Sequence, residues 1–357
     1  MALLKVTDRL IKNYPSGMRN QIINGDFQIW QRGTSFVAQA NGSHSADKWV
    51  YSKSGAMVHT VEQSTDVPTQ AESGYLSKYS HLMDCTTADV SIAAGDVCAI
   101  GQRIEGHMYR SLQGKACTLS FWVKGTKTGI HCISFKNGGL DRSYVVEYTI
   151  NTTNTWEKKS IPITFDNTAG TWYYDWRLGL EVNWCLAAGS TWHTTADAWQ
   201  TGDFFATSSQ VNACDNTANN FTLAQVQLEA SEVATEFETR HVGFEQDLCA
   251  RYYEKLSDAL WTVFAIGQVW VAGVGSYVQI KFTQKRLAPA FSYSGTMRNH
   301  ARNENRDVTS LIFAEITLVQ ATITVLAGGS TTWVAGDFCL LQAKNSVSSA
   351  IHINADL

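Results

Sequence analysis

Neither a run of basic residues nor a long apolar segment occurs in this chain. Charged residues make up only 17% of its 357 residues, and the formal net charge is −4. Proteins that bind nucleic acid through its phosphates carry clustered Lys and Arg, so this charge balance predicts no nucleic-acid partner. The most apolar window, residues 260–275, is interrupted by Gln268 and is too short to span a bilayer as a helix. We therefore expect no membrane insertion.

Cysteine spacings typical of metal or redox motifs are also missing. None of the eight cysteines forms a CxxC pair or has a histidine at zinc-finger spacing. Several occupy apolar strand positions, which predicts reduced packing residues, although a local Cys85–Cys98 bridge remains open. The first residues lack the apolar stretch and cleavage site of a signal peptide, which predicts a soluble chain made in a cytoplasm.

Signatures of enzymes are absent as well. The sequence has no GxSxG, HExxH, P-loop or dinucleotide-binding glycine pattern, so we expect no enzymatic activity. One reaction remains open, because a glycoside hydrolase needs only two carboxylates at the right separation. The carboxylates that could serve lie in the aromatic-rich part of the chain: Glu105, Asp141, Glu147 and Asp175.

Alternating strand patterns fill most of the chain. The 12 Trp, 13 Tyr and 15 Phe stand among many Thr, Ser, Asn and Gly, a mixture that favours strands joined by polar turns. In residues 117–124 apolar and other side chains alternate, and similar strands recur with turn signals between them. This pattern predicts an all-β fold, with an antiparallel jelly-roll β-sandwich over residues 21–240.

The period changes on both sides of this sandwich. Residues 241–258 repeat apolar side chains at helical spacing, which predicts a connecting amphipathic helix. Residues 259–357 return to strands and predict a small C-terminal β-sandwich domain. Residues 1–20 contain a short helical pattern that is too short to be stable alone, so we expect an N-terminal docking arm.

Aromatic residues are densest between positions 172 and 199. Flat aromatic rings stack on the apolar faces of sugars, but they also fill cores and subunit interfaces, and the pattern leaves all three roles open. Trp172 and Tyr174 share one face of a strand. The candidate carbohydrate-binding residues are Trp172, Tyr174, Trp176, Trp184 and Trp192.

Eight motifs in order resemble a family of bacteriophage tail proteins with a carbohydrate-binding-module-like jelly roll. They are "NQIINGDFQIWQRGTSF", "ADKWVY", "GQRIEG", "TLSFWVKGTKTG", "YTINTTNTWEKKSIPI", "GTWYYDWRLGLEVNW", "GDFFATSSQVN" and "FTLAQVQLEASEVATEFETR". The resemblance is strong over residues 18–260 and loose beyond them. In this family the first motif forms the first strand, which places Phe27 and Ile29 in the core, and Trp30 with Arg32 at one end or at a seam between subunits.

The resemblance implies a structural virion protein, a tail fibre or receptor-binding protein. It implies a homotrimer that docks on other phage tail proteins through the N-terminal arm and contacts a host-surface glycan or lipopolysaccharide. Such a protein is synthesised in the host cytoplasm and resides in the virion tail. The alternatives are a secreted polysaccharide-binding accessory module and a polysaccharide depolymerase.

Related jelly rolls often hold a structural calcium ion. The resemblance implies Asp26 as one ligand, but Ala224 and Gln225 stand where the second carboxylate is expected. Calcium takes six to eight oxygen ligands, so the expectation is no cofactor, with a calcium ion at Asp26 as the alternative.

Overall fold

The computed structural model describes residues 18–166, 168–256, 259–329, 332–344 and 348–357. The chain divides into two compact units, Met1–His241 and Val242–Leu357, and each is described on its own. The expected docking arm, residues 1–20, lies almost entirely outside the described residues. Within the part of the chain that the structure describes, no helix has the length and apolarity needed to cross a bilayer.

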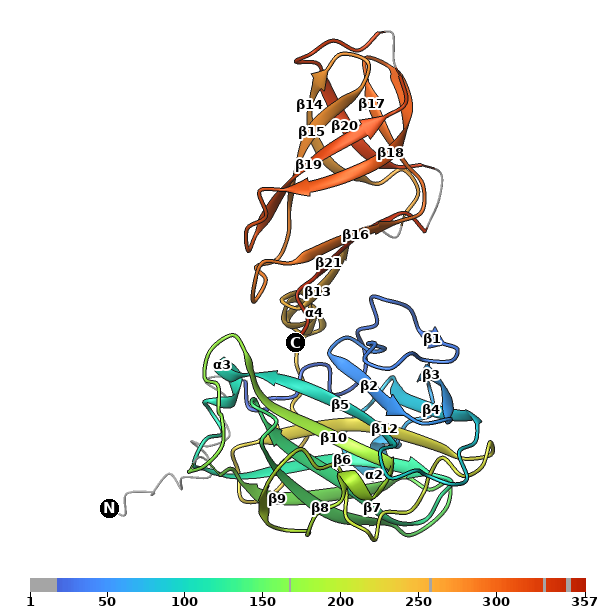
Figure 1. Ribbon diagram of the computed structural model, residues 1–357, viewed down its shortest axis with the longest axis vertical. Helices are drawn as coiled ribbons and strands as arrows, with labels where there is room; N and C mark the ends of the chain where they lie inside the picture. The colour runs from blue at the N-terminus through green and yellow to red at the C-terminus, as the bar shows by residue number, and fades with distance from the viewer. Residues whose placement is uncertain (1–17, 167, 257–258, 330–331, 345–347) are drawn as a thin grey trace, which may run out of the picture. The chain divides into compact units, whose positions relative to one another are not determined.

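The first unit is a jelly-roll sandwich of two six-stranded antiparallel sheets (Figure 1). The first sheet has the order β1-β3-β4-β12-β6-β9. Its strands are β1 (Ser35–Phe36), β3 (Val58–Ser64), β4 (Ser80–Thr87), β12 (Asn220–Glu229), β6 (Ala116–Gly125) and β9 (Glu157–Thr164).

The second sheet faces the first with the order β11-β8-β7-β10-β5-β2. Its strands are β11 (Trp199–Thr201), β8 (Arg142–Ile150), β7 (Gly129–Asn137), β10 (Leu178–Ala188), β5 (Val97–Glu105) and β2 (Trp49–Ser54). Short helical turns connect some of them: α2 (Gln70–Ser73), α3 (Gly106–Tyr109) and η1 (Ser190–Trp192).

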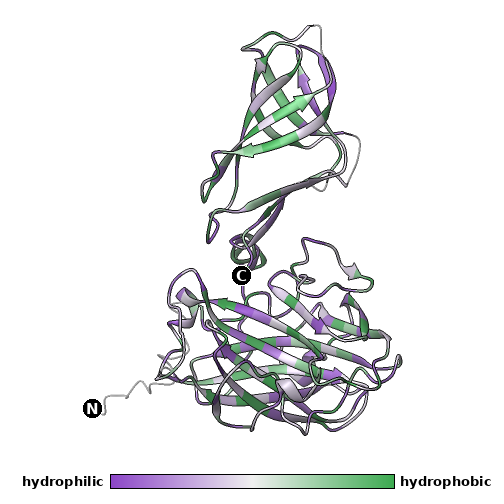
Figure 2. Ribbon diagram, viewed as in Figure 1, coloured by the Kyte–Doolittle hydropathy of each residue, from purple (hydrophilic) through white to green (hydrophobic). Residues whose placement is uncertain are grey.

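Apolar side chains of both sheets meet in one core between them. Green and purple residues succeed each other along many strands in Figure 2, as expected where one strand face is buried. Trp184 on β10 reaches Trp49 on β2 and Phe121 on β6, with ring centroids 5.4 Å and 5.6 Å apart. The predicted all-β jelly roll is therefore confirmed.

The stretch "NGDFQIWQRG", residues 24–33, is not the expected first strand. It forms turns at residues 24–26 and 31–32 around an irregular segment, and both Asn24 and Phe27 have positive φ. Asn24 replaces the missing sheet bonds, because its amide group donates to the Ile29 carbonyl and accepts from the Ile29 N–H. Phe27, Ile29 and Trp30 are all buried, so side chains do not alternate between two faces as they would in a strand.

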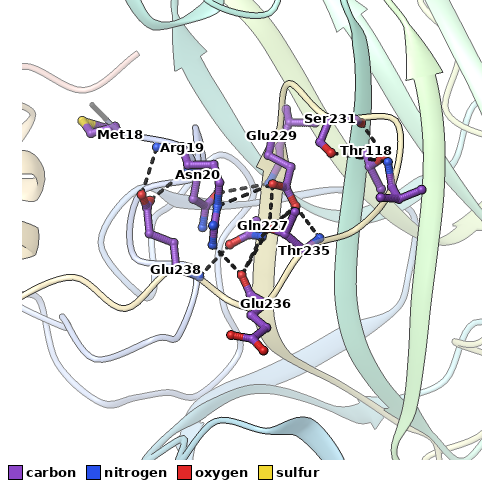
Figure 3. Close-up of polar contacts among 12 residues, drawn as sticks. Met18, Arg19, Asn20, Thr118, Gln227, Glu229, Ser231, Thr235, Glu236 and Glu238 are labelled. Atoms are coloured by element: carbon purple, nitrogen blue, oxygen red, sulfur yellow. Dashed lines mark hydrogen bonds and ion pairs between the residues drawn. The ribbon is translucent and has the colours of Figure 1, made fainter. Parts of the chain in front are cut away.

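A polar network joins the start of the first unit to its end (Figure 3). The backbone N–H groups of Arg19 and Asn20 donate to the Glu238 carboxylate at 3.0 Å and 2.9 Å. The buried Glu229 at the end of β12 accepts from Gln227 at 2.8 Å and from the Thr235 N–H at 2.9 Å. Arg19 Nε lies 3.5 Å from Glu229, so the buried carboxylate has a cationic partner. We call this set the end clamp.

The second unit begins with a helix that is shorter than expected. The helical pattern predicts a helix over 241–258, but α4 spans only Val242–Ala250. Residues Tyr253–Leu256 form strand β13 instead, which pairs with β21 (Ala350–Asn354) and so gains sheet hydrogen bonds that a helix would forgo. β16 (Ala290–Ser294) completes this three-stranded sheet.

The remaining strands of the second unit form a closed barrel, which corrects the expected small sandwich. Its order is β14-β15-β19-β18-β17-β20. The strands are β14 (Val263–Val271), β15 (Gly275–Lys281), β19 (Gln320–Ala327), β18 (Glu304–Ala314), β17 (Met297–Ala301) and β20 (Phe338–Ala343). The sheet closes because β14 and β17 both pair with β20, which leaves no free edge between them.

Candidate functional site

Two of the predicted aromatic residues lie together at one end of the jelly roll. Trp172 and Tyr174 both stack on the fully buried Tyr109, with centroids 5.0 Å and 6.0 Å from it and nearly parallel planes. Trp172 also meets Trp199 edge to face at 5.7 Å. The indole N–H groups donate to backbone carbonyls, Trp172 to Ala169 at 2.8 Å and Trp199 at 3.0 Å to Thr164. These rings build the end of the sandwich.

The next residues of the same loop face solvent. The Arg177 guanidinium lies over the Tyr173 ring, 3.9 Å from its centroid, and forms an ion pair with Asp175 at 2.8 Å. Arg177 also donates hydrogen bonds to the Asp175 carboxylate, and these bonds lower the pKa of Asp175 to about 2. Trp176 beside them is 46% exposed. Tyr173, Asp175, Trp176 and Arg177 form the end-loop surface.

Trp184 is a core residue, so its predicted role in carbohydrate binding is wrong. Its side chain is 0% exposed and packs between the two sheets. Successive side chains of β10 point to opposite faces of the sheet, and Trp184 is on the face that turns toward the core.

Trp192 stands apart from the other predicted residues. Trp192 follows strand β10, whereas residues 172–176 precede that strand. A strand of this length separates its two ends by on the order of 30 Å. Its indole N–H donates to Gly95 at 2.9 Å and its ring meets Phe205 edge to face at 5.4 Å. The five candidates therefore do not form one platform.

Asp26 follows Gly25, whose carbonyl accepts a hydrogen bond from the Val226 N–H of β12. Burial raises the pKa of its carboxyl group, although Gln28 and Tyr75 donate hydrogen bonds to it. Gln225, where a second carboxylate is expected, points its amide at Ser73 and Ser77, at 2.9 Å and 2.7 Å. Asp26 as a metal ligand therefore stays a prediction.

Two carboxyl groups of the first unit, Asp141 and Glu181, have lowered pKa values. Hydrogen bonds from Asn137 and Thr171 lower the pKa of Asp141. On β10, burial raises the pKa of Glu181, but the charges of Lys136 and Arg103 outweigh burial and the net shift is downward. A general acid of a glycoside hydrolase needs a raised pKa, and neither carboxyl group has one.

A groove on the outside of the barrel was not predicted from the sequence. It has a volume of about 510 Å³. Its lining residues are Ile266, Gly267, Gln268, Tyr277, Val278, Gln279, Thr322, Gly336 and Phe338. Tyr277 is 40% exposed and Phe338 62% exposed. The sequence of β14 carries apolar residues on both faces of the strand, whereas a barrel strand needs only one apolar face. The second apolar face was the sequence feature that could have indicated the groove.

The strand register arranges these side chains in two rows across the barrel wall. Phe338 on β20 is paired with Gln268 on β14, which is paired with Tyr277 on β15. In the neighbouring row Ile266 is paired with Gln279, and Gln279 with Thr322 on β19. Since adjacent strands lie about 4.8 Å apart, the two rings stand about 10 Å apart with an amide between them.

The sequence matches no family model and no curated protein. Among solved structures, a tailspike protein 4 domain of bacteriophage CBA120 aligns with a TM-score of 0.32 and 16% identity. That alignment covers 55% of this chain and 21% of the tailspike domain, so this chain spans about a fifth of that protein's length.

Carbohydrate-binding proteins also align with the chain. TmCBM61, solved with β-1,4-galactotriose, gives a TM-score of 0.29 and 12% identity over 60% of this chain and 100% of its own. A putative sugar binding protein from Bacteroides thetaiotaomicron gives 0.34 and 13% over 60% and 100%. At this level of similarity no ligand or site residue is transferred to this chain.

Proposed function

We propose that this chain is a non-enzymatic bacteriophage tail protein, a tail fibre or receptor-binding protein, that attaches to a host-surface glycan. The observation that carries the glycan part is the barrel groove, where two exposed rings flank an amide. The ordered sequence motifs, which resemble those of phage tail proteins, support the virion part.

The chemistry of the groove fits an uncharged sugar. Tyr277 and Phe338 offer faces for the C–H side of a pyranose ring, while Gln268 and Gln279 can both donate to and accept from hydroxyls. No Lys, Arg, Asp or Glu is among the nine lining residues. A neutral stretch of a surface polysaccharide or of lipopolysaccharide therefore suits the groove better than a phosphate or a sugar acid.

The end-loop surface is a weaker second candidate for the same function. Trp176 is exposed there, but Arg177 and Asp175 are already paired with each other. A ligand would have to compete with that ion pair for hydrogen bonds.

Glycan-array binding of single variants tests which surface acts. We expect Tyr277→Ala and Phe338→Ala each to weaken binding by about tenfold or more, since a stacked aromatic ring contributes on the order of 1–2 kcal/mol. Ile312→Ala, at an exposed position of β18 outside the groove lining, is the matched control and should bind like the wild type. Trp176→Ala probes the end loop. Unchanged binding in both groove variants would refute the groove.

The virion role has separate readouts. We expect sedimentation analysis to show a stable trimer, and antibodies against the chain to label the tails of intact particles. Incubation with host capsule or lipopolysaccharide should release no reducing ends. A monomer absent from particles contradicts the tail role, and sustained release of reducing ends contradicts the non-enzymatic role.

A further inference from the structure

Three side chains with metal-binding atoms meet in the core of the jelly roll. They are His59 on β3, Cys98 on β5 and Cys214 in the segment before β12. One ligand atom from each lies within 4.8 Å of the others, and all three residues are buried. Nothing in the sequence spacing indicates this group, because the two sheets and a loop bring it together.

The distance between Cys214 and His59 approaches that within a tetrahedral zinc site. Cys214 Sγ is 3.8 Å from His59 Nε2, and Cys98 Sγ is 3.9 Å from His59 Nδ1. With Zn–S bonds of about 2.3 Å and Zn–N bonds of about 2.0 Å, a nitrogen and a sulfur of one tetrahedral shell stand about 3.5 Å apart. Cys98 lies on the Nδ1 side of the ring, so its side chain would have to turn toward an ion held by Nε2.

Tyr51 prepares the imidazole for this role. Its hydroxyl group lies 2.7 Å from His59 Nδ1 and can accept the proton of that nitrogen. In the tautomer that donates from Nδ1 to Tyr51, Nε2 is free of hydrogen and faces Cys214. A hydrogen-bond partner behind a ligating histidine is the usual companion of a zinc ligand.

A third thiol lies beside the group. Cys85 on β4 is buried, is paired in register with His59 on β3, and has its Sγ 3.8 Å from the Cys214 carbonyl oxygen. All eight cysteines are free, so the locally possible Cys85–Cys98 bridge is not formed and both thiols are available. Three thiols and one imidazole are a donor set found in closed structural zinc sites.

We propose that His59, Cys98 and Cys214, completed by Cys85, bind one zinc ion in the core of the jelly roll. Each ligating thiol gives its proton to solvent as its Zn–S bond forms, and the divalent ion offsets the thiolate charges that the apolar core would otherwise disfavour. Because the group is buried, the ion enters while the unit folds.

Metal analysis of the full chain tests this. After expression with added zinc and purification without chelators, mass spectrometry of the elements should find about one zinc ion per wild-type chain. Cys98→Ser and Cys214→Ser should each hold at least about tenfold less. Cys132→Ser is the matched control, since Cys132 is also buried in the second sheet but belongs to another cluster, and it should keep its zinc.

The visible absorption spectrum of the cobalt-loaded wild-type chain gives a test that does not depend on whether the variants fold. Chains produced with cobalt in place of zinc should show the visible absorption of tetrahedral thiolate-bound Co²⁺. Wild-type protein without zinc and without this spectrum would overturn the proposal. So would equal zinc in Cys98→Ser and Cys132→Ser, or an intact mass that shows a Cys98–Cys214 disulfide.

Discussion

Trp176 and Trp184 belong to one aromatic stretch of the sequence and have opposite surroundings. Trp184 is enclosed by rings from both sheets, whereas Trp176 lies in the end-loop surface. The density of aromatics between residues 172 and 199 indicated a core, a subunit interface or a sugar-binding surface. It could not separate core from surface, because that depends on which strand face each ring occupies after the sheets pair.

The two tryptophans should therefore differ in their effect on stability. We expect Trp184→Ala to lower the free energy of unfolding by about 3–5 kcal/mol, because it leaves a large cavity between the sheets. Trp176→Ala should lower it by less than about 1 kcal/mol. Urea denaturation followed by circular dichroism measures both. Similar losses for the two variants would contradict the assignment of Trp184 to the core.

His81 on β4 should make the first unit less stable in acid. Its ring lies 5.4 Å from Phe27 and 5.5 Å from Trp30, and burial lowers its pKa from the usual 6.5 to about 3. The unfolded chain gains this proton below pH 6.5 while the folded chain refuses it until about pH 3. The contribution to stability is thus complete above pH 6.5 and is lost as the pH falls through that window, by about 2 kcal/mol at pH 5.

Denaturation at pH 7 and pH 5 checks this with variants. In His81→Gln the difference in unfolding free energy between the two pH values should shrink by about 2 kcal/mol. His300→Gln, in the barrel, is the control and should keep the wild-type difference for the first unit. An unchanged difference in His81→Gln would show that this histidine does not titrate in the way described.

At the scale of elements, strand β14 shows why the groove was hard to predict. Its apolar run was recognised as strand-forming, but both faces carry apolar or aromatic residues and the sequence does not say which face turns inward. The register with β15 and β20 decides this, and it places Ile266 and Trp270 outward. Side chains from four strands then line one groove, a long-range arrangement that no local pattern contains.

Gly267 should be the residue on which this arrangement depends most. A Cβ atom there would lie 1.9 Å from the Tyr277 carbonyl oxygen, so β15 would have to move. We expect Gly267→Ala to lower the stability of the barrel by about 1–3 kcal/mol and to displace Tyr277. Gly328→Ala is the control, because a Cβ atom there has no atom within 4 Å. Equal melting of the two variants would contradict the close approach.

At the scale of the whole molecule, the all-β class and the jelly roll could be predicted from alternation and from the ordered motifs. Two features could not. The chain closes its second unit as a barrel through the pairing of β14 with β20, whose partners are far apart in sequence. Residues 24–33 form turns because Asn24 bonds to the backbone of Ile29, although their composition is that of a strand.

The two units have separate cores and should unfold separately. One apolar cluster lies between the sheets of the jelly roll, and another fills the barrel and its three-stranded sheet. Calorimetry should show two transitions, with Trp184→Ala lowering the temperature of one and Gly267→Ala that of the other. A single transition shifted by both variants would contradict independent cores.

Contacts between its two ends would decide how each unit carries mechanical load, and in the first unit these include the end clamp. The chain enters the jelly roll at Arg19 and Asn20 and leaves it at Arg240, whose guanidinium donates to the Asn20 and Ile22 carbonyls. In the second unit, likewise, β13 near its start pairs with β21 near its end. A force applied along the chain would therefore act first on these contacts between the two ends of each unit. The rest of the sheets and the barrel would not lie between the points where the force is applied. Ion pairs and short hydrogen-bonded ladders, rather than either hydrophobic core, would set the force at which each unit begins to unfold.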